Sequence, residues 1–291
     1  MEVQDKTPAA KALQQSVKTV GSQPDVFYQS VVFQALLNIL ADASLATKHP
    51  DVIEVILSIF KTQGLKCVPF LPQVIPAFSA MCRASHSRHQ NFYVKQMSLI
   101  VQIIGSHIRN YLDDVFLLTR ELWSNPFLRL PIVELIESLA NAMGAEFKPY
   151  LPSVIPQLLT IFDQPEGNER SATEVRVFQA MLSFGSAIEE YLHLILPYIL
   201  STIERPTAST ESRKVAVVTI GDLARRINLA ESVSRIVQPL VRTLPTSEGQ
   251  FRHAIMDTLC ILLLQLGPDF AVFVPRLRSV SAHVQNPSMT Y

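Results

Sequence analysis

A glycine followed six residues later by an aromatic residue recurs along this chain at intervals of about forty residues. The pairs are Gly64 and Phe70, Gly105 and Tyr111, Gly144 and Tyr150, Gly185 and Tyr191, and Gly267 and Phe273. The steps between successive aromatic residues are 41, 39, 41 and 82 residues, so the last step holds two intervals. Five of the nine glycines of the chain occupy this register. The chain is therefore built from repeats.

Repeats of about 40 residues with helical content are typical of helix-pair solenoids of the HEAT or armadillo kind. The sequence predicts an all-α fold, a HEAT-repeat α-solenoid, in which antiparallel helix pairs form a superhelix. After a half repeat over 25–46, the expected pairs span 49–83, 88–124, 126–164, 168–204, 209–244 and 248–284. Residues 1–24 are expected to form a flexible tail or linker, and residues 285–291 the C-terminal end.

One unit illustrates how the pattern predicts two helices. Between Pro126 and Met143 the apolar residues recur every three or four positions, which makes one apolar helical stripe of Leu128, Ile132, Leu135, Ile136, Leu139 and Met143. Gly144 follows, where a left-handed C-cap would end the helix. A second apolar stretch begins at Tyr150, with Pro152 suited to a first helical turn, where its missing N–H is not needed.

The start of the second helix recurs elsewhere in the chain. Pro72 follows Phe70, and Pro275 follows Phe273, as Pro152 follows Tyr150. A later proline stands at Pro76, Pro156, Pro197 and Pro239, where it should bend the helix rather than begin it. The half repeat has its own expected stripe, made of Phe27, Val31, Val32, Ala35, Leu36 and Ile39.

Charge and cysteine content limit the classes of function. The 25 basic and 25 acidic residues balance, so the chain lacks the basic excess of nucleic-acid binding domains. Charged residues are 17% of the chain, where about 25% is usual for soluble domains, which suggests that part of the apolar surface is covered by a partner or by further chain. Three widely spaced cysteines favour a reducing compartment, and no apolar run reaches the length of a membrane span.

The candidate chemical motifs are weak. Cys82, His86 and His89 have the residue types of a zinc site but lack a fourth ligand. The adjacent carboxylates at Asp113–Asp114 and Glu189–Glu190 are better explained by the helix dipole than by acid–base catalysis. The basic pairs at 213–214 and 225–226 are expected on a solvated face, which could meet an acidic partner. We therefore expect no catalytic, cofactor-binding or metal-binding residues and no cofactor.

Several longer runs resemble a known family. The stretches 64–76, 106–111, 144–152, 191–197, 241–244 and 254–259 closely resemble the middle HEAT region of the target of rapamycin kinases. The resemblance runs from about Phe27 to Val284, whereas residues 1–24 show no convincing match. The family consists of very large serine/threonine protein kinases whose catalytic domain lies far downstream, so the resemblance carries over no catalytic or ATP-binding residue.

The resemblance implies a role in assembly. In the family, this solenoid bridges the N-terminal solenoid and later helical repeats, packs in the kinase dimer and lies near adaptor subunits such as Raptor. The expected partners are thus the rest of the kinase chain, a second protomer and a Raptor-like adaptor, with no nucleic acid, small-molecule substrate or membrane span. The expected location is the cytoplasm and, through the full complex, the lysosomal or vacuolar membrane.

Two other classes of function remain open at this point. One is an independent HEAT adaptor that binds cargo in the manner of nuclear transport receptors, although these often have acidic inner surfaces and this chain is neutral. The other is an enzyme in its own right, which the absence of nucleophile, phosphate-loop and kinase motifs disfavours.

Overall fold

The computed structural model describes residues 24–165, 167–275 and 278. The expected tail at 1–24 and the end at 285–291 lie, apart from Pro24, outside the described residues. Helices account for the regular structure of the described part, in which no strand occurs. The chain divides into two compact units, Met1–Asn125 and Pro126–Tyr291.

Each unit is a stack of helix pairs. We call the helix that precedes the repeat turn the first helix and the one that follows it the second helix. The first helices are α3 (His49–Gln63), α5 (Ser87–Ile104), α7 (Pro126–Met143), α9 (Asn168–Leu182), α11 (Thr210–Ala224) and α13 (Gly249–Leu266). The second helices are α4 (Leu71–Ala84), α6 (Leu112–Leu122), α8 (Leu151–Leu159), α10 (Leu192–Glu204) and α12 (Val233–Thr243), and α2 (Pro24–Ala41) precedes the first full pair.

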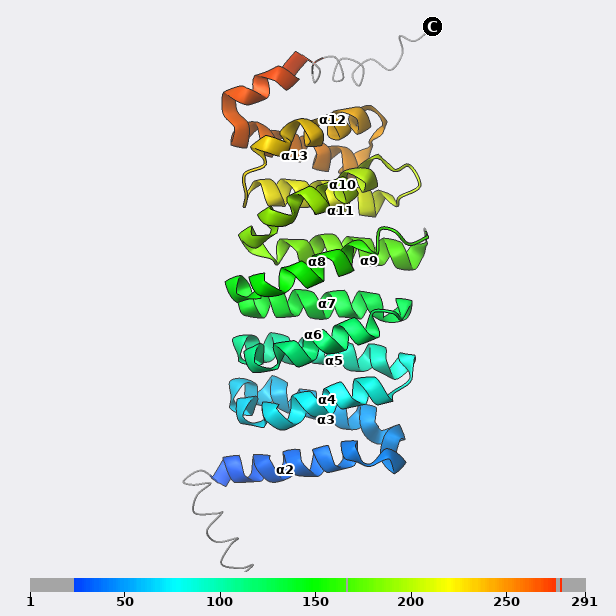
Figure 1. The fold of residues 1–291 in the computed structure, drawn as a ribbon, viewed down its shortest axis with the longest axis vertical. Coiled ribbons are helices and arrows are strands. Elements are labelled where there is room, and N and C mark those ends of the chain that lie inside the picture. Colours follow the sequence, from blue (N-terminus) through cyan, green and yellow to red (C-terminus); the bar gives the residue numbers. More distant parts are fainter. Residues whose placement is uncertain (1–23, 166, 276–277, 279–291) are drawn as a thin grey trace, which may run out of the picture. The chain divides into compact units, whose positions relative to one another are not determined.

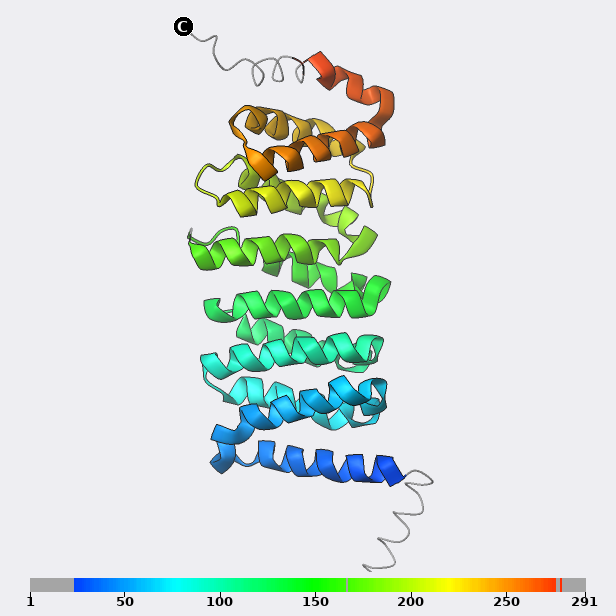
Figure 2. The ribbon, with the colours of Figure 1, turned by 180° about the vertical axis from the view of Figure 1, so that it is seen from behind.

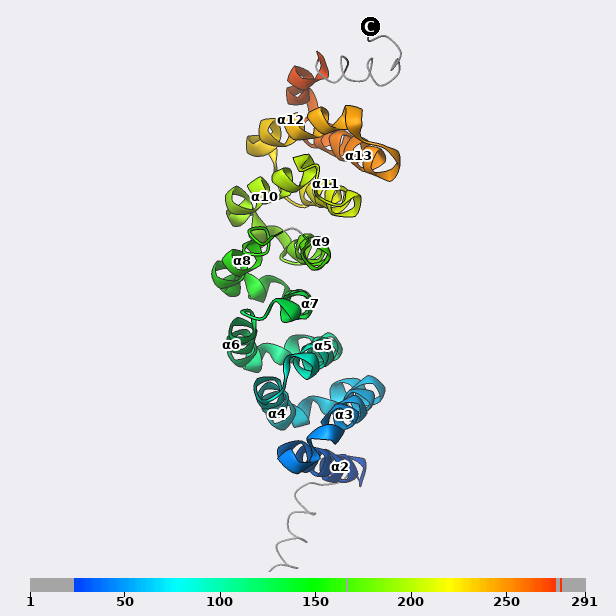
Figure 3. The ribbon, with the colours of Figure 1, turned by 90° about the vertical axis from the view of Figure 1, so that its right-hand side faces the viewer.

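Within each unit the helices form two rows. In the N-terminal unit α3 packs against α5, and α2 and α6 pack against α4. In the C-terminal unit α7, α9, α11 and α13 pack one on the next, and α8, α10 and α12 lie on the other side (Figure 1; Figure 3). Seen from behind, the first helices of the C-terminal unit run side by side (Figure 2).

A 3-10 segment joins the two helices of most pairs. These segments begin at the repeat glycine and end at the repeat aromatic residue: η2 (Gly64–Phe70), η3 (Gly105–Tyr111), η4 (Gly144–Tyr150), η5 (Gly185–Tyr191) and η8 (Gly267–Phe273). The pair of α11 and α12 has a short turn, η6 (Ala230–Ser232), instead. Two further 3-10 segments, η1 (Ala43–Lys48) and η7 (Leu244–Thr246), connect successive pairs.

The repeat glycines do not adopt the expected left-handed helical cap. Gly64 has φ 58° and ψ −130°, and Gly267 has φ 56° and ψ −127°. A positive φ with this ψ differs from the left-handed helical region, in which ψ is about +47°. It is the conformation of the first central residue of a type II′ turn, which glycine adopts without steric cost. The turn redirects the chain at once into the 3-10 segment.

The apolar stripe predicted for 126–143 is confirmed. All six of its residues are buried in α7. Within its unit α7 packs against α9 and η4, and complete burial of one apolar side chain stabilises a fold by about 1.5–3 kcal/mol. A single pair could not bury both of its apolar faces, so each pair depends on its neighbours.

The stripe predicted for the half repeat is wrong. On α2 the side chains of Val31, Val32 and Ala35 are exposed, whereas Phe33 and Leu40 are buried. Phe33 stacks on Phe70 with ring centroids 4.3 Å apart. The helix is apolar on two faces, and α3 and α4 cover only the face that includes Phe33.

The second helices begin just before the earlier proline and continue past the later one. Pro72 and Pro152 lie in the first turn of α4 and α8, and Pro76 and Pro156 lie inside the same helices. A proline inside a helix frees the carbonyl four residues before it. Pro76 and Pro156 are exposed, so water can hydrate those carbonyls. Pro275 lies in helical backbone two residues after Phe273.

Two stretches of the described chain, Ala43–Ala84 and Gly249–Phe273, are apolar and long enough to cross a membrane by length and composition alone. Neither is a single straight helix, because Gly64 and Gly267 interrupt them with positive φ. Half of the most apolar part of the first stretch is buried within the fold. Buried helices of a stacked array have the same composition, so the absence of a membrane span stays a prediction.

Candidate interaction site

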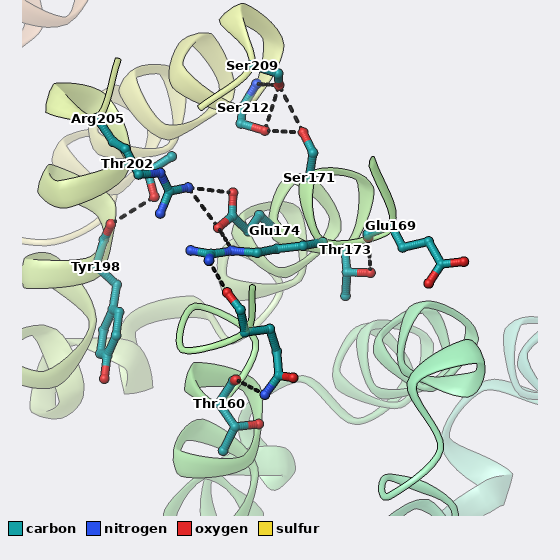
Figure 4. A network of polar contacts seen from close by, with 12 residues as sticks. Thr160, Glu169, Ser171, Thr173, Glu174, Tyr198, Thr202, Arg205, Ser209 and Ser212 are labelled. Carbon is teal, nitrogen blue, oxygen red and sulfur yellow. Dashed lines mark hydrogen bonds and ion pairs between the residues drawn. The ribbon is translucent and has the colours of Figure 1, made fainter. Parts of the chain in front are cut away.

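A network of polar contacts in the C-terminal unit surrounds Glu174 on α9 (Figure 4). Its carboxylate is only 2% exposed and lies 2.7 Å from Nε of Arg170, one turn earlier on the same helix. The Nη2 atom of Arg205, the residue that follows α10, lies 2.9 Å from Oε1 and 3.1 Å from Oε2 of the same carboxylate. Arg170 also donates to the backbone oxygen of Gln164. The buried carboxylate thus joins α9 to the residue that follows α10, and Arg170 joins α9 to the chain that follows α8.

Three serine hydroxyls extend these contacts to α11. The Oγ atom of Ser171 lies 2.9 Å from that of Ser209 and 2.8 Å from that of Ser212. Ser209 is the N-cap of α11, and its hydroxyl accepts a hydrogen bond from the backbone N–H of Ser212 at 3.0 Å. Such a cap satisfies a backbone donor of the first turn. We call Arg170, Ser171, Glu174, Arg205, Ser209 and Ser212 the polar junction.

A second, half-buried ion pair connects α9 to α7. Nη2 of Arg176 lies 2.7 Å from Oε2 of Glu137, whose side chain is 18% exposed. Burial raises the pKa of the Glu137 carboxyl, and the Arg176 guanidinium opposes this effect. The first helix α9 therefore has ion pairs with α7 of the preceding repeat and with the residue that follows its own partner helix, α10.

Two small clefts flank the N-terminal end of α9. One, of about 360 Å³, is lined by residues that include Pro126, Ile161 and Thr173. The other, of about 190 Å³, is lined by residues that include Thr207 and Ser209. Arg170 borders both clefts. The polar groups that line the clefts are guanidinium groups, hydroxyls and a paired carboxylate. Groups of this kind suit a structural or binding role.

An acidic residue at a repeat position that is otherwise apolar is the sequence signal for the polar junction. Counted eleven residues before the repeat glycine, Glu174 occupies the position of Ile53 in α3 and Val133 in α7. Those residues are fully buried, so an acidic residue in the same place is expected to need a buried cationic partner. The distance in sequence between Glu174 and Arg205 hid that partner.

The solvated face that we expected for the basic pairs is only partly formed, because Arg225 and Arg226 are exposed whereas Arg213 and Lys214 are half-buried. Arg213 lies 4.7 Å from the ring centroid of Phe251 on α13 and donates to the backbone oxygen of Ile203. Arg226 donates to the backbone oxygen of Leu182, in the preceding repeat. These guanidinium groups connect repeats, because neighbouring pairs bring carbonyls and a ring within their reach.

The paired carboxylates lie next to helix starts. Asp113 and Asp114 lie in the first turn of α6. Glu190 precedes α10 and lies 2.6 Å from Nζ of Lys148 in the preceding repeat. That pair is more than half exposed on both sides, and exposed pairs contribute little to stability.

The residues considered for zinc differ in burial. Cys82 is fully buried, whereas His86 and His89 are exposed. Among the residues that the structure describes, no group of three or more histidine, cysteine or acidic side chains could hold a metal ion.

The cysteines should differ sharply in reactivity. Cys67 and Cys82 are buried and Cys260 is exposed. Burial raises the pKa of the Cys82 thiol to about 12 and also raises that of Cys67, so both stay protonated at pH 8 and neither is the reactive thiolate.

We expect a maleimide at pH 8 to label one thiol per folded chain, at Cys260. Mass spectrometry of peptides gives the site, and labelling of all three cysteines in urea is the control. Rapid labelling of Cys82 in the folded chain would contradict the expectation.

Exposed apolar side chains gather on two helices. On α13 Leu264 is 83% exposed, with Met256 and Leu263 nearly half exposed. On α2 Val31 is 52% exposed. These side chains are candidates for contact with other polypeptide, in line with the low charge content.

The comparisons with known proteins agree on one family. The sequence model described as "Serine/threonine-protein kinase mTOR domain" matches residues 2–105, so the lack of a match expected for residues 1–24 is wrong. The chain is 39% identical over 254 residues to "Serine/threonine-protein kinase tor1" of Schizosaccharomyces pombe, which covers 87% of this chain and 11% of that protein. It is 37% identical to "Serine/threonine-protein kinase TOR2" of Saccharomyces cerevisiae, over 88% of this chain and 10% of that protein. The chain thus spans about a tenth of the length of these relatives.

Solved structures show the same fold. A crystal structure of importin beta matches with a TM-score of 0.66 and 20% identity, over 89% of this chain and 35% of that one. At this identity the likeness is one of fold alone. The predicted all-α HEAT solenoid is confirmed.

Proposed function

This chain belongs to the target of rapamycin serine/threonine-protein kinase family, in which it corresponds to one helical-repeat segment, and we propose that it acts there as a non-catalytic scaffold. In this role it bridges solenoid parts of the kinase and supports assembly of the dimer and of a Raptor-like adaptor. The observation that carries the proposal is the 36–39% identity to three such kinases over 87–91% of this chain. The complex would work in the cytoplasm and at the lysosomal or vacuolar membrane, in growth signalling.

The physical basis of the proposed role is the stacking of helix pairs. Each pair is held by its neighbours through buried apolar side chains and through contacts such as Thr258 Oγ1 to the backbone oxygen of Val217, at 3.1 Å. A stack of this kind keeps the parts attached to it at a set separation and presents helix faces to partners. The cargo-receptor alternative rests on likeness of fold alone and has no observation of its own in support.

Charge placed on the exposed apolar side chains should weaken assembly. In a full-length kinase, Leu264→Glu and Val31→Glu are each expected to lower the recovery of adaptor or second protomer in a pull-down at least tenfold, because a contact that buries a charge without a partner is costly. Both side chains are already in solvent, so the isolated chain should keep its circular dichroism and melting temperature.

A matched control is His253→Glu, at an exposed polar position on the same helix as Leu264. This variant should leave the recovery unchanged. Full recovery of both partners by both apolar-site variants would count against the proposed role of these surfaces.

A further inference from the structure

The N-terminal half of α9 is held by contacts of a different kind from those of its C-terminal half. The buried residues of the C-terminal half are Val177, Phe178, Ala180 and Met181. The buried residues of the N-terminal half are Thr173 and Glu174. The first half therefore depends on the polar junction, and the second half on apolar packing.

Two of the other first helices of the C-terminal unit, α7 and α13, do not share this division, whereas the N-terminal half of α11 buries only Ser212 and Ala216. In α7 the buried residues Leu128, Ile132 and Val133 lie in the N-terminal half of the helix. In α13 the N-terminal half buries Phe251, Ala254 and Ile255. The two clefts beside α9 also lie at its N-terminal end, so apolar packing is lowest where the polar contacts are concentrated.

Polar and apolar contacts respond differently to a small displacement. A buried ion pair is favourable only at short distance and good geometry, because the cost of desolvating both charges nearly cancels their attraction. Once water enters, it hydrates the carboxylate and the guanidinium groups, so separating the ion pair costs little net free energy. For apolar side chains, by contrast, the free-energy cost of opening keeps rising as more of their surface is exposed to water. A segment held by polar contacts alone can thus open without the segment beside it.

In a stack of repeats, stability is close to a sum of terms for each repeat and for each pair of neighbours. Local opening occurs in the segment whose contacts contribute least to that sum. We propose that residues 168–176 of α9 form a latch that opens as a unit, while residues 177–182 stay packed. Opening separates Glu174 from Arg205 and Ser171 from Ser209 and Ser212, and so releases α9 from α10 and α11.

Such a latch is a conformational device built into the array. While it is closed, Glu174 holds Arg205, Arg170 holds the backbone at Gln164, and Ser171 holds the start of α11. Together these contacts make the α9 repeat rigid with respect to the next. When it opens, the Arg205 guanidinium and the first turn of α11 become accessible to solvent. The latch is independent of the proposed scaffold function, because it follows from contacts within this chain.

Hydrogen exchange with mass spectrometry tests the latch on the unmodified chain. Backbone amides of 171–176 should exchange at least tenfold faster than those of 177–182, after correction for intrinsic rates. They should also exchange at least tenfold faster than those at the matching depth of α13, 252–257. Equal protection of 171–176 and 177–182 would overturn the proposal.

Two variants separate a local opening from general unfolding. Glu174→Gln, which keeps the size of the side chain, should accelerate exchange of 171–176 a further tenfold and leave α13 unchanged. The triple variant Arg170→Met, Glu174→Met and Arg205→Met replaces the polar contacts by apolar ones and should slow exchange of 171–176. If Glu174→Gln accelerated exchange equally throughout the C-terminal unit, that result would also overturn the proposed latch. Glu190→Gln, which breaks the exposed pair with Lys148, is the control and should change neither segment.

Discussion

Replacing Glu174 with alanine is expected to lower the free energy of unfolding by about 3 kcal/mol, because removal of one partner of a buried ion pair leaves an uncompensated charge. Here two guanidinium groups lose the same carboxylate. The side chains of Arg170 and Arg205 are 10% and 21% exposed, so both are largely cut off from water. The value lies at the lower end of the usual range of about 3–5 kcal/mol, since Arg205 can turn toward solvent.

Urea unfolding followed by circular dichroism measures this change. The matched control is Glu190→Ala, which removes the carboxylate of an exposed pair that also links two repeats, and its midpoint should stay close to that of the unmodified chain. If Glu174→Ala were as stable as Glu190→Ala, the carboxylate of Glu174 would have no net structural role.

Replacing Gly144 with alanine is expected to cost about 1–3 kcal/mol of stability. Gly144 has φ 54°, a conformation in which an L-residue places its β-carbon too close to the backbone. A β-carbon at this position meets no other atom within 4 Å, so the cost arises from the backbone alone. The turn between α7 and η4 would shift or remain strained.

Gly167 provides the control for this substitution. Its backbone is extended, with φ 176°, and a β-carbon there also meets nothing within 4 Å. Gly167→Ala should therefore be neutral or slightly stabilising, because alanine restricts the unfolded chain more than glycine does. Melting temperatures of the two variants, measured side by side, give the comparison. A Gly144→Ala variant as stable as Gly167→Ala would show that the positive φ is not required.

The fold was predictable because its determinants are local. The stripe from Leu128 to Met143 arises from spacing of three and four residues, which puts side chains on one face of any helix. The repeat glycine marks a turn within two or three residues of itself. Repetition of both signals along the chain indicates stacked pairs, even though no single repeat is distinctive.

The candidate site was less predictable. Arg213 and Arg226 resemble surface residues in the sequence. Only the structure shows that Arg213 lies over the ring of Phe251 and that Arg226 donates to the backbone oxygen of Leu182. On α2, two apolar faces compete, and the sequence does not indicate which one the neighbouring helices cover. In each case the missing information is the identity of the neighbour.

By itself the sequence determined the repeat length, the helix pairs and their turns, since these depend on contacts between residues close together in the chain. The tertiary structure decided which charges are buried, which partners they have and which apolar faces remain in water. Those outcomes depend on how one pair lies against the next. Packing within a pair acts in the same way, because it brings Glu174 on α9 and Arg205, the residue after α10, to 2.9 Å and leaves little water between them.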